Sequence, residues 1–176
     1  NKSEFQVVVN MPEGTPVERT ARVLNSLADI VRRTPEVTDW QAYAGTSAPI
    51  NFNGLVRQYY LRGDPNQGDL QVNLVDKAHR SEQSHAISQR LRPALTKIAA
   101  AYGARVKVVE VPPGPPVLSP IVAEVYGPDH AGRTRVAEAV RKVFALTPGV
   151  VDIDQSTIEE APRQILVVDR RKAALL

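Results

Sequence analysis

The chain has 176 residues, of which 43% are hydrophobic and 23% are charged, and its formal net charge at pH 7 is +3. This balance is typical of a chain that folds and excludes a disordered composition. No apolar run reaches the roughly 18 residues of a membrane-spanning helix, and the N-terminus lacks a signal-peptide pattern. We expect a soluble fragment, and a first residue of Asn1 instead of Met favours a segment of a longer protein.

The small excess of positive charge does not by itself predict a nucleic-acid-binding protein. The basic residues are spread along predicted helix faces and are not interleaved with the aromatic residues on which single strands stack. We therefore expect no nucleic-acid partner, and RNA binding on a sheet face stays open as a third class of function. The chain has no cysteine, which excludes a disulfide framework and a thiol nucleophile.

The first two thirds of the sequence predict strands and helices in a regular order. Apolar runs bounded by turn residues predict extended segments over residues 3–10, 37–44, 55–61, 70–75 and 106–111. The segments 55–61 and 70–75 are expected to form a hairpin. Apolar side chains at spacings of three and four predict helices over residues 15–34 and 81–101.

This order of strand, helix, strand, strand, helix, strand predicts an α+β fold of the ferredoxin-like (βαββαβ) type. Right-handed crossovers would place both helices on one face of an antiparallel sheet. Thr15 and Glu18 surround Pro16 at the start of the first helix, and this spacing predicts a capping box there.

The beginning of this pattern occurs twice in the chain. An apolar strand and a helix lead to Thr-Pro-Glu-Val-Thr-Asp at residues 34–39, and a second strand and helix lead to Thr-Pro-Gly-Val-Val-Asp at residues 147–152. The elements expected in the second copy are a strand at 121–126, a helix at 131–146, strands at 150–154 and 164–169, and a helix that opens at Arg170.

The two copies predict two subdomains that are not equally complete. Four prolines within residues 112–116 indicate a stiff boundary. We predict a first subdomain over residues 1–111, a Pro-rich linker over 112–119, and a partial second ferredoxin-like subdomain over 120–176. The second copy lacks its last strand and most of its second helix. We expect the two copies to form the two walls of a cleft.

No residue pattern predicts catalysis, a cofactor site or a metal site. His79 and His85 are six residues apart, a spacing that does not place two ligands on one helix face. Asp152 with Asp154, and the adjacent Glu159-Glu160, are acidic pairs without any sign of the cleft that acid–base catalysis needs. We therefore expect that the protein is not an enzyme.

The loop over residues 45–54 combines turn residues with two large apolar side chains, Ile50 and Phe52. A loop of this kind can line a pocket for apolar ligands, because large side chains bind through burial with little directional demand. The alternative is that Phe52 packs into the local core.

Four groups of residues carry a family resemblance that covers nearly the whole chain. They are Val8-Val9-Asn10-Met11-Pro12-Glu13-Gly14-Thr15 with Arg19-Thr20, then Gly68-Asp69-Leu70-Gln71-Val72-Asn73-Leu74, then Arg80, and last Leu166-Val167-Val168-Asp169-Arg170-Arg171-Lys172-Ala173. In this order and spacing, the chain resembles the second large periplasmic region of resistance-nodulation-division (RND) transporters of the acriflavine-resistance type, which export hydrophobic and amphiphilic compounds.

The resemblance implies a porter region with one complete and one interrupted subdomain. In the family a docking domain is inserted before the last strand of the second subdomain, which would explain the unfinished second copy. The cleft between the subdomains is where substrates of the family enter, and the loop that matches residues 45–54 is its switch loop. Ile50 and Phe52 would then be switch-loop residues.

The resemblance also implies substrate-contacting positions in the second subdomain. Ile121, Ala123 and Val125 would face the pocket, and Asp154 and Ser156 fall where a typical drug pump has a basic and an amide residue. A smaller and more acidic pocket would favour cations. The metal-exporting branch uses methionine ligands, and the only methionine is Met11 in the first turn, so metal export is disfavoured.

These points combine into one leading hypothesis. The chain would be the periplasmic substrate-binding part of a proton-driven inner-membrane efflux pump that takes up small amphiphilic molecules. The intact protein would be a homotrimer that works with a periplasmic adaptor and an outer-membrane channel. The alternative is a stand-alone ferredoxin-like ligand-binding or regulatory domain.

Overall fold

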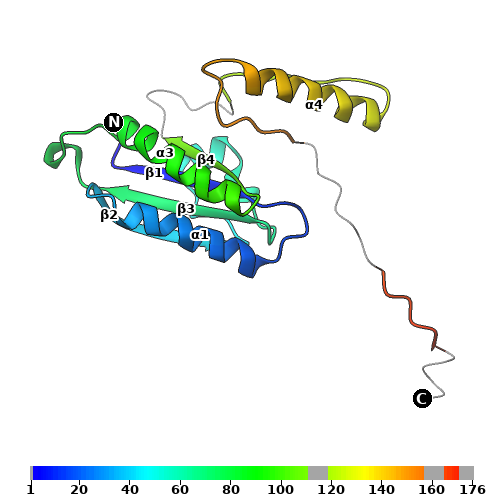
Figure 1. Cartoon of the computed structure of the whole chain (residues 1–176), viewed down its shortest axis with the longest axis horizontal. Helices are drawn as coiled ribbons and strands as arrows, with labels where there is room; N and C mark the ends of the chain where they lie inside the picture. Colours follow the sequence, from blue (N-terminus) through cyan, green and yellow to red (C-terminus); the bar gives the residue numbers. More distant parts are fainter. Residues whose placement is uncertain (1, 111–118, 157–164, 171–176) are drawn as a thin grey trace.

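A computed structural model describes residues 2–110, 119–156 and 165–170. The first subdomain forms a four-stranded antiparallel sheet in the order β2-β3-β1-β4 (Figure 1). Its strands are β1 (Glu4–Asn10), β2 (Val37–Ala44), β3 (Gln67–Leu74) and β4 (Arg105–Glu110). The longer helices are α1 (Val17–Arg32) and α3 (Ser84–Ala101), and the short ones are α2 (Phe52–Val56), η1 (Tyr59–Leu61) and η2 (Lys77–His79). This topology confirms the predicted α+β, ferredoxin-like fold.

The core lies between one face of the sheet and the helices α1 and α3, which cover that face side by side (Figure 1). Val7 of β1 stands between Leu70 of β3 and Val108 of β4 in the register of the sheet. The helices contribute buried side chains that lie on one face of each helix, namely Val23, Leu24, Leu27 and Val31 from α1 and Ile87, Leu91 and Leu95 from α3. The periodicity that predicted both helices therefore also identifies their buried faces.

The predicted capping box at the start of α1 is wrong. The hydroxyl of Thr15 donates a hydrogen bond to the carbonyl of Pro12 at 2.6 Å, so it closes the preceding turn. The N-cap residue is Pro16, whose side chain has no polar atom that could accept from the helix.

The predicted hairpin of residues 55–61 with 70–75 is also wrong. Residues 52–61 contain α2 and η1. At the start of α2, the side-chain oxygen of Asn51 accepts from Gly54 N, and the backbone carbonyl of Asn51 accepts from Leu55 N. Gln58 has a φ of +58°, which an extended strand does not allow. Both edges of β3 are already paired, one with β1 and one with β2, so no edge is free for a further strand.

The second copy of the repeat contains its predicted helix, which is α4 (His130–Leu146). Its predicted strands are absent: the residues 121–126, 150–154 and 165–169 have no ladder partner in the described part of the chain. A strand persists only when a neighbour pairs its backbone groups and covers one face. Neither condition is met here, since α4 has no buried residue and Leu166 is almost fully exposed.

Parts of the predicted organisation lie outside the described residues. They are positions 112–118 of the Pro-rich linker, the Glu159-Glu160 pair, and the helix predicted beyond Arg170. Within the described residues, no helix has both the length and the apolar character that crossing a bilayer requires.

Candidate functional site

The segment that connects β2 to β3 crosses the face of the sheet opposite to α1 and α3. Leu70 points into the core, so the alternation of a strand directs its neighbour Asp69 to this opposite face. Asp69 is fully buried there, and Ala48 and Arg62 of the connection both donate hydrogen bonds to it. Val8 and Gln6 on β1 are buried on the same face.

Arg62 holds the end of this connection against two strands. Its Nε donates to Asp69 Oδ1 at 3.1 Å, and its Nη1 donates to Asn10 Oδ1 at 2.7 Å. Its Nη2 donates to the carbonyl oxygens of Val9 at 2.8 Å and of Gly68 at 3.2 Å. The guanidinium therefore links β1, β3 and the connection through four acceptors, and its side chain is only 12% exposed.

The buried carboxylate of Asp69 has several partners. Besides Arg62, the backbone N–H of Ala48 donates to its Oδ2 at 3.2 Å, and the side chain of Gln6 also bonds to it. Burial raises the pKa of Asp69 above its ordinary value, and the nearby Arg62 and these hydrogen bonds oppose the shift without cancelling it. The carboxylate is thus costly to keep ionised, yet it organises the connection around it.

Ala48 and Arg62 anchor the connection to Asp69, and the residues between them, 49–61, carry exposed apolar side chains. Ile50 is 69% exposed, and Leu55, Tyr60 and Leu61 are also exposed. Phe52 is the first residue of α2, and its side chain lies outside the described part of the structure. Large exposed apolar side chains grouped on one anchored segment are typical of a surface that binds a partner or an apolar ligand.

The structure places the other predicted site residues around α4. Ile121 and Ala123 are exposed and Val125 is half-buried, all in the extended segment before that helix. Ser156 is exposed on the segment after it. Because the described residues form no second sheet, these positions are not gathered into a wall opposite Ile50. Their role as pocket residues stays a prediction.

Asp154 is the predicted site residue that the structure brings to the first subdomain. Its carboxylate pairs with the ammonium of Lys107 on β4. It also lies close enough to η1 to act on Tyr59: burial raises the pKa of that phenol, and the charge of Asp154 adds to the increase. Asp154 thus stands between the edge strand β4 and the anchored segment, with its charge matched by Lys107.

A second ion pair stands beside the first. Asp152 pairs with Arg92 of α3, whose Nη2 also donates to the carbonyl of Val108 at 3.2 Å. Asp152 has a φ of +56°, in the left-handed region that aspartate tolerates better than most residues. The sequence analysis did not identify four site residues: Arg62, Asp69, Arg92 and Lys107. In the sequence each of them looks like an ordinary surface residue, because its partner is known only from the fold.

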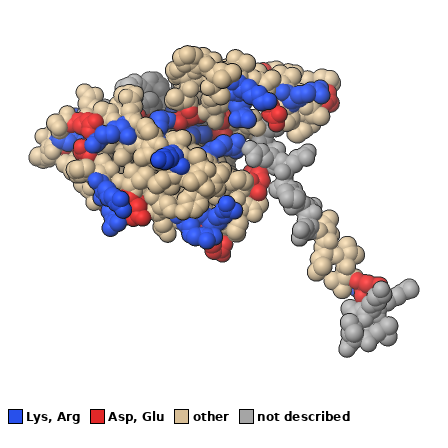
Figure 2. Space-filling view, viewed as in Figure 1, with Lys and Arg blue, Asp and Glu red and all other residues tan. Residues whose placement is uncertain are grey.

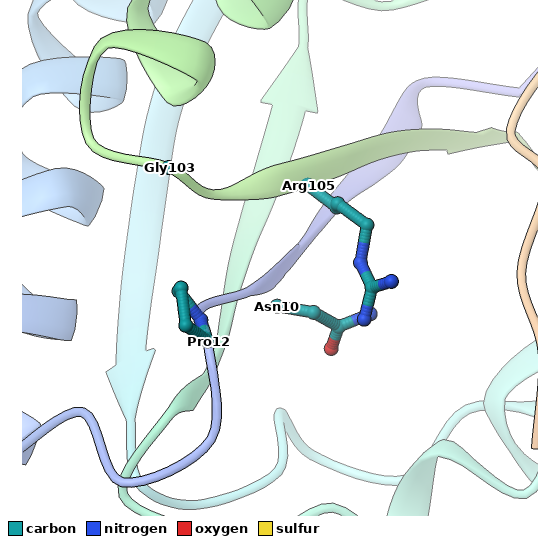
Figure 3. Close-up of a pocket in the computed structure, with 4 residues that line it drawn as sticks. All are labelled: Asn10, Pro12, Gly103 and Arg105. Carbon is teal, nitrogen blue, oxygen red and sulfur yellow. The ribbon is translucent and has the colours of Figure 1, made fainter. Parts of the chain in front are cut away.

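A separate small cavity opens at one end of the sheet. It has a volume of about 130 Å³ and is lined by Asn10, Pro12, Gly103 and Arg105. Figure 3 shows the Arg105 side chain beside that of Asn10, its register partner across β1 and β4. The lining contains none of the predicted site residues. The cavity lies next to Arg62, because Asn10 in its lining also accepts a hydrogen bond from Arg62.

In the view of Figure 2, the positively charged side chains do not form one continuous patch. Lys and Arg side chains lie in separate groups among Asp and Glu on both the first subdomain and the helix beside it. His85 lies next to a carboxylate, with Nδ1 3.1 Å from Oε1 of Glu110. Within the described residues, no three potential metal ligands of the His, Cys, Asp or Glu type come together.

Comparisons with known proteins agree with the fold and identify the family. Two X-ray crystal structures of a heavy metal efflux pump are similar to this chain: crystal form I with a TM-score of 0.68 at 21% identity, and crystal form II with 0.65 at 20%. Each covers 100% of this chain, which spans only 18% of theirs. At this identity the likeness establishes the fold alone.

The search of curated proteins found no significant match. The family model described as the AcrB/AcrD/AcrF family matches residues 1–176. The chain therefore belongs to the AcrB/AcrD/AcrF family of RND transporters.

Proposed function

We propose that this chain is the substrate-binding part of the porter region of an efflux pump of the acriflavine-resistance type. It takes up apolar or amphiphilic compounds in the cleft between the first subdomain and the second. It carries out no covalent chemistry. The observation that carries the proposal is the anchored segment of residues 49–61 with its exposed apolar side chains.

The physical argument starts from the type of side chain on this segment. Aliphatic and aromatic groups bind amphiphiles by removing apolar surface from water, at about 25 cal/mol per Å². Such binding requires no fixed hydrogen-bond pattern, which suits a transporter of chemically varied compounds. Because Lys107 neutralises the charge of Asp154, we expect the apolar part of an amphiphile, more than its charge, to determine the affinity, and we favour amphiphiles over simple inorganic cations.

A metal cargo is the second candidate, because the similar solved structures are of a heavy metal efflux pump. Soft metal ions prefer sulfur ligands. Met11 is the only methionine and is 2% exposed, packed in the core of the first subdomain. The ligand chemistry of the segment therefore favours an amphiphile.

We extend the proposal to the intact protein. It would lie in the inner membrane with this segment in the periplasm, use proton antiport, and assemble as a homotrimer with a periplasmic adaptor and an outer-membrane channel. The family match over all residues favours this assignment over a stand-alone regulatory domain.

Fluorescence titration of the chain with the amphiphilic dye rhodamine 6G tests the proposed function. The substitution Phe52→Ala should weaken dye binding while the midpoint of thermal unfolding stays the same. Unchanged dye affinity combined with a lower unfolding midpoint would assign Phe52 to the core and remove it from the site.

A further inference from the structure

Both ends of the segment of residues 49–61 are tied to the same buried carboxylate. Ala48 N, immediately before the segment, donates to Asp69 Oδ2, and Arg62, immediately after it, donates to Asp69 Oδ1. Ala48 itself is buried, as is Asp69. The thirteen residues of the segment thus begin and end beside one side chain on β3.

The segment between these two points is held by local bonds. Its described backbone hydrogen bonds run from Leu55 N to Asn51 O, from Gln58 N to Leu55 O, and from Leu61 N to Gln58 O. They shape α2 and η1 but do not fix either element to the sheet. The hydrogen bonds of Ala48 and Arg62 to Asp69 link both ends of the segment to the sheet, beside the packing of its buried Gly54 and half-buried Tyr59.

A buried ion pair of this kind contributes little to stability compared with apolar side chains of the same volume. The raised pKa of Asp69 shows that burial is incompletely compensated. Such pairs can instead select one arrangement among several of similar stability, because each alternative leaves a charge unpaired. Arg62 suits this role because its planar fork reaches Asp69, Asn10 and two backbone carbonyls at once, which a lysine ammonium cannot do.

We propose that Arg62 and Asp69 are positioning residues that set where the substrate-contacting segment of residues 49–61 lies on the sheet. The pair acts through the segment and does not itself contact substrate. The statement that this segment contacts substrate rests on the proposed function. The place of the segment on the sheet can be measured without any substrate.

The test uses the absence of cysteine from the chain, which allows two nitroxide labels at chosen sites. One label replaces exposed Leu55 on α2, and the other replaces exposed Ala42 on β2. Pulsed electron paramagnetic resonance then gives the distance distribution between segment and sheet. Arg62→Lys and Asp69→Asn should both broaden or shift this distribution. Asp29→Asn, which breaks an exposed ion pair with Arg32 on α1, is the matched control and should not.

Rhodamine 6G titration of the same variants separates positioning from a purely structural role. Both substitutions should weaken dye binding by about tenfold, the size expected when one buried charged partner is lost. Far-ultraviolet circular dichroism should stay the same. If either single variant fails to fold, the double variant Arg62→Gln/Asp69→Asn removes both charges together, and it should show the same broadened distribution.

An unchanged distance distribution in the folded Arg62 and Asp69 variants would overturn the inference, whatever the dye does. Failure of the wild-type chain to bind any dye would instead count against the proposed function. In that case the label distances alone would still decide whether the pair positions the segment.

Discussion

The guanidinium of Arg92 on α3 forms an ion pair with the carboxylate of Asp152, 60 residues later in the chain. Two residues further on, Asp154 pairs with Lys107 on the neighbouring β4. Among the described residues, the strand β4 is paired on one side only, with β1, so it is an edge of the sheet. The two ion pairs therefore hold the segment after α4 beside this edge.

We predict that the double substitution Asp152→Asn/Asp154→Asn separates this segment from the first subdomain. Partly exposed ion pairs each contribute about 0.2–1 kcal/mol, so the two together hold the contact only weakly. Nitroxide labels at exposed positions of α3 and of α4 should report a longer and broader distance in the double variant. Raising the salt concentration should lengthen the wild-type distance in the same way, because ions screen exposed charges.

The control for this prediction is Asp29→Asn, whose ion pair with Arg32 lies within α1. It should leave the distance between α3 and α4 unchanged. A double variant with the wild-type distance at all salt concentrations would show that other contacts hold the segment.

The second prediction concerns the pH dependence of stability that Asp69 causes. Burial raises the pKa of Asp69 above its ordinary value of 3.8, so the folded chain binds this proton more readily than the unfolded chain. Its contribution to stability is therefore fully present below the unfolded pKa and is lost as the pH rises through the folded pKa.

Urea unfolding of the wild type and of Asp69→Asn from about pH 4 to about pH 8 measures this contribution. The free energy of unfolding of the wild type should fall relative to that of the variant as the pH rises through the folded pKa of Asp69. A wild type that gains stability relative to the variant over this window would mean that Arg62 outweighs burial.

The third prediction concerns the close approach of α1 to the start of β3. A Cβ atom added to Gly68 would lie 2.8 Å from a methyl group of Leu24 and 3.2 Å from the carbonyl oxygen of Tyr43. The carbonyl belongs to β2, which is paired with β3, so it moves aside less readily than a side chain. Gly68→Ala should therefore destabilise the chain by about 1–3 kcal/mol in urea unfolding. Gly63→Ala is the matched control, since a Cβ there meets no atom within 4 Å. Equal effects at both glycines would contradict the packing described at Gly68.

The fourth prediction compares two leucines with opposite surroundings. Leu95 of α3 is fully buried, whereas Leu146 at the end of α4 is 85% exposed. Leu95→Ala should cost about 2–5 kcal/mol of unfolding free energy, and Leu146→Ala should stay within about 0.5 kcal/mol of the wild type. A large loss at Leu146 would show that α4 packs on a core that the described residues do not form.

Much of the fold could be predicted because local pattern and tertiary contacts agree in the first subdomain. The stripe of Leu24, Leu27 and Val31 on α1 and the alternation of Leu70 and Val72 on β3 both face the same core. The segment of residues 55–61 could not be assigned in this way. Its β-forming residues favour a strand, but Asn51 starts a helical turn, and β3 has no free edge.

The candidate site was predicted only in part. Ile50 and Phe52 stood out because large apolar residues are uncommon in a loop rich in Gly, Pro and Asn. The anchor could not be found from sequence, since Arg62 and Asp69 meet only after β3 pairs with β1 and the connection folds across the sheet. The strands expected around α4 depended on partners that the described chain does not supply.

The most direct test of the substrate-binding role compares two exposed aliphatic side chains in one dye titration. Ile50 lies on the proposed substrate-contacting segment, and Leu146 lies on α4 with even greater exposure. The account predicts saturable binding of rhodamine 6G that weakens clearly in Ile50→Ser and is unchanged in Leu146→Ser. Equal weakening in both variants, or none in Ile50→Ser, would contradict a specific role for the segment of residues 49–61.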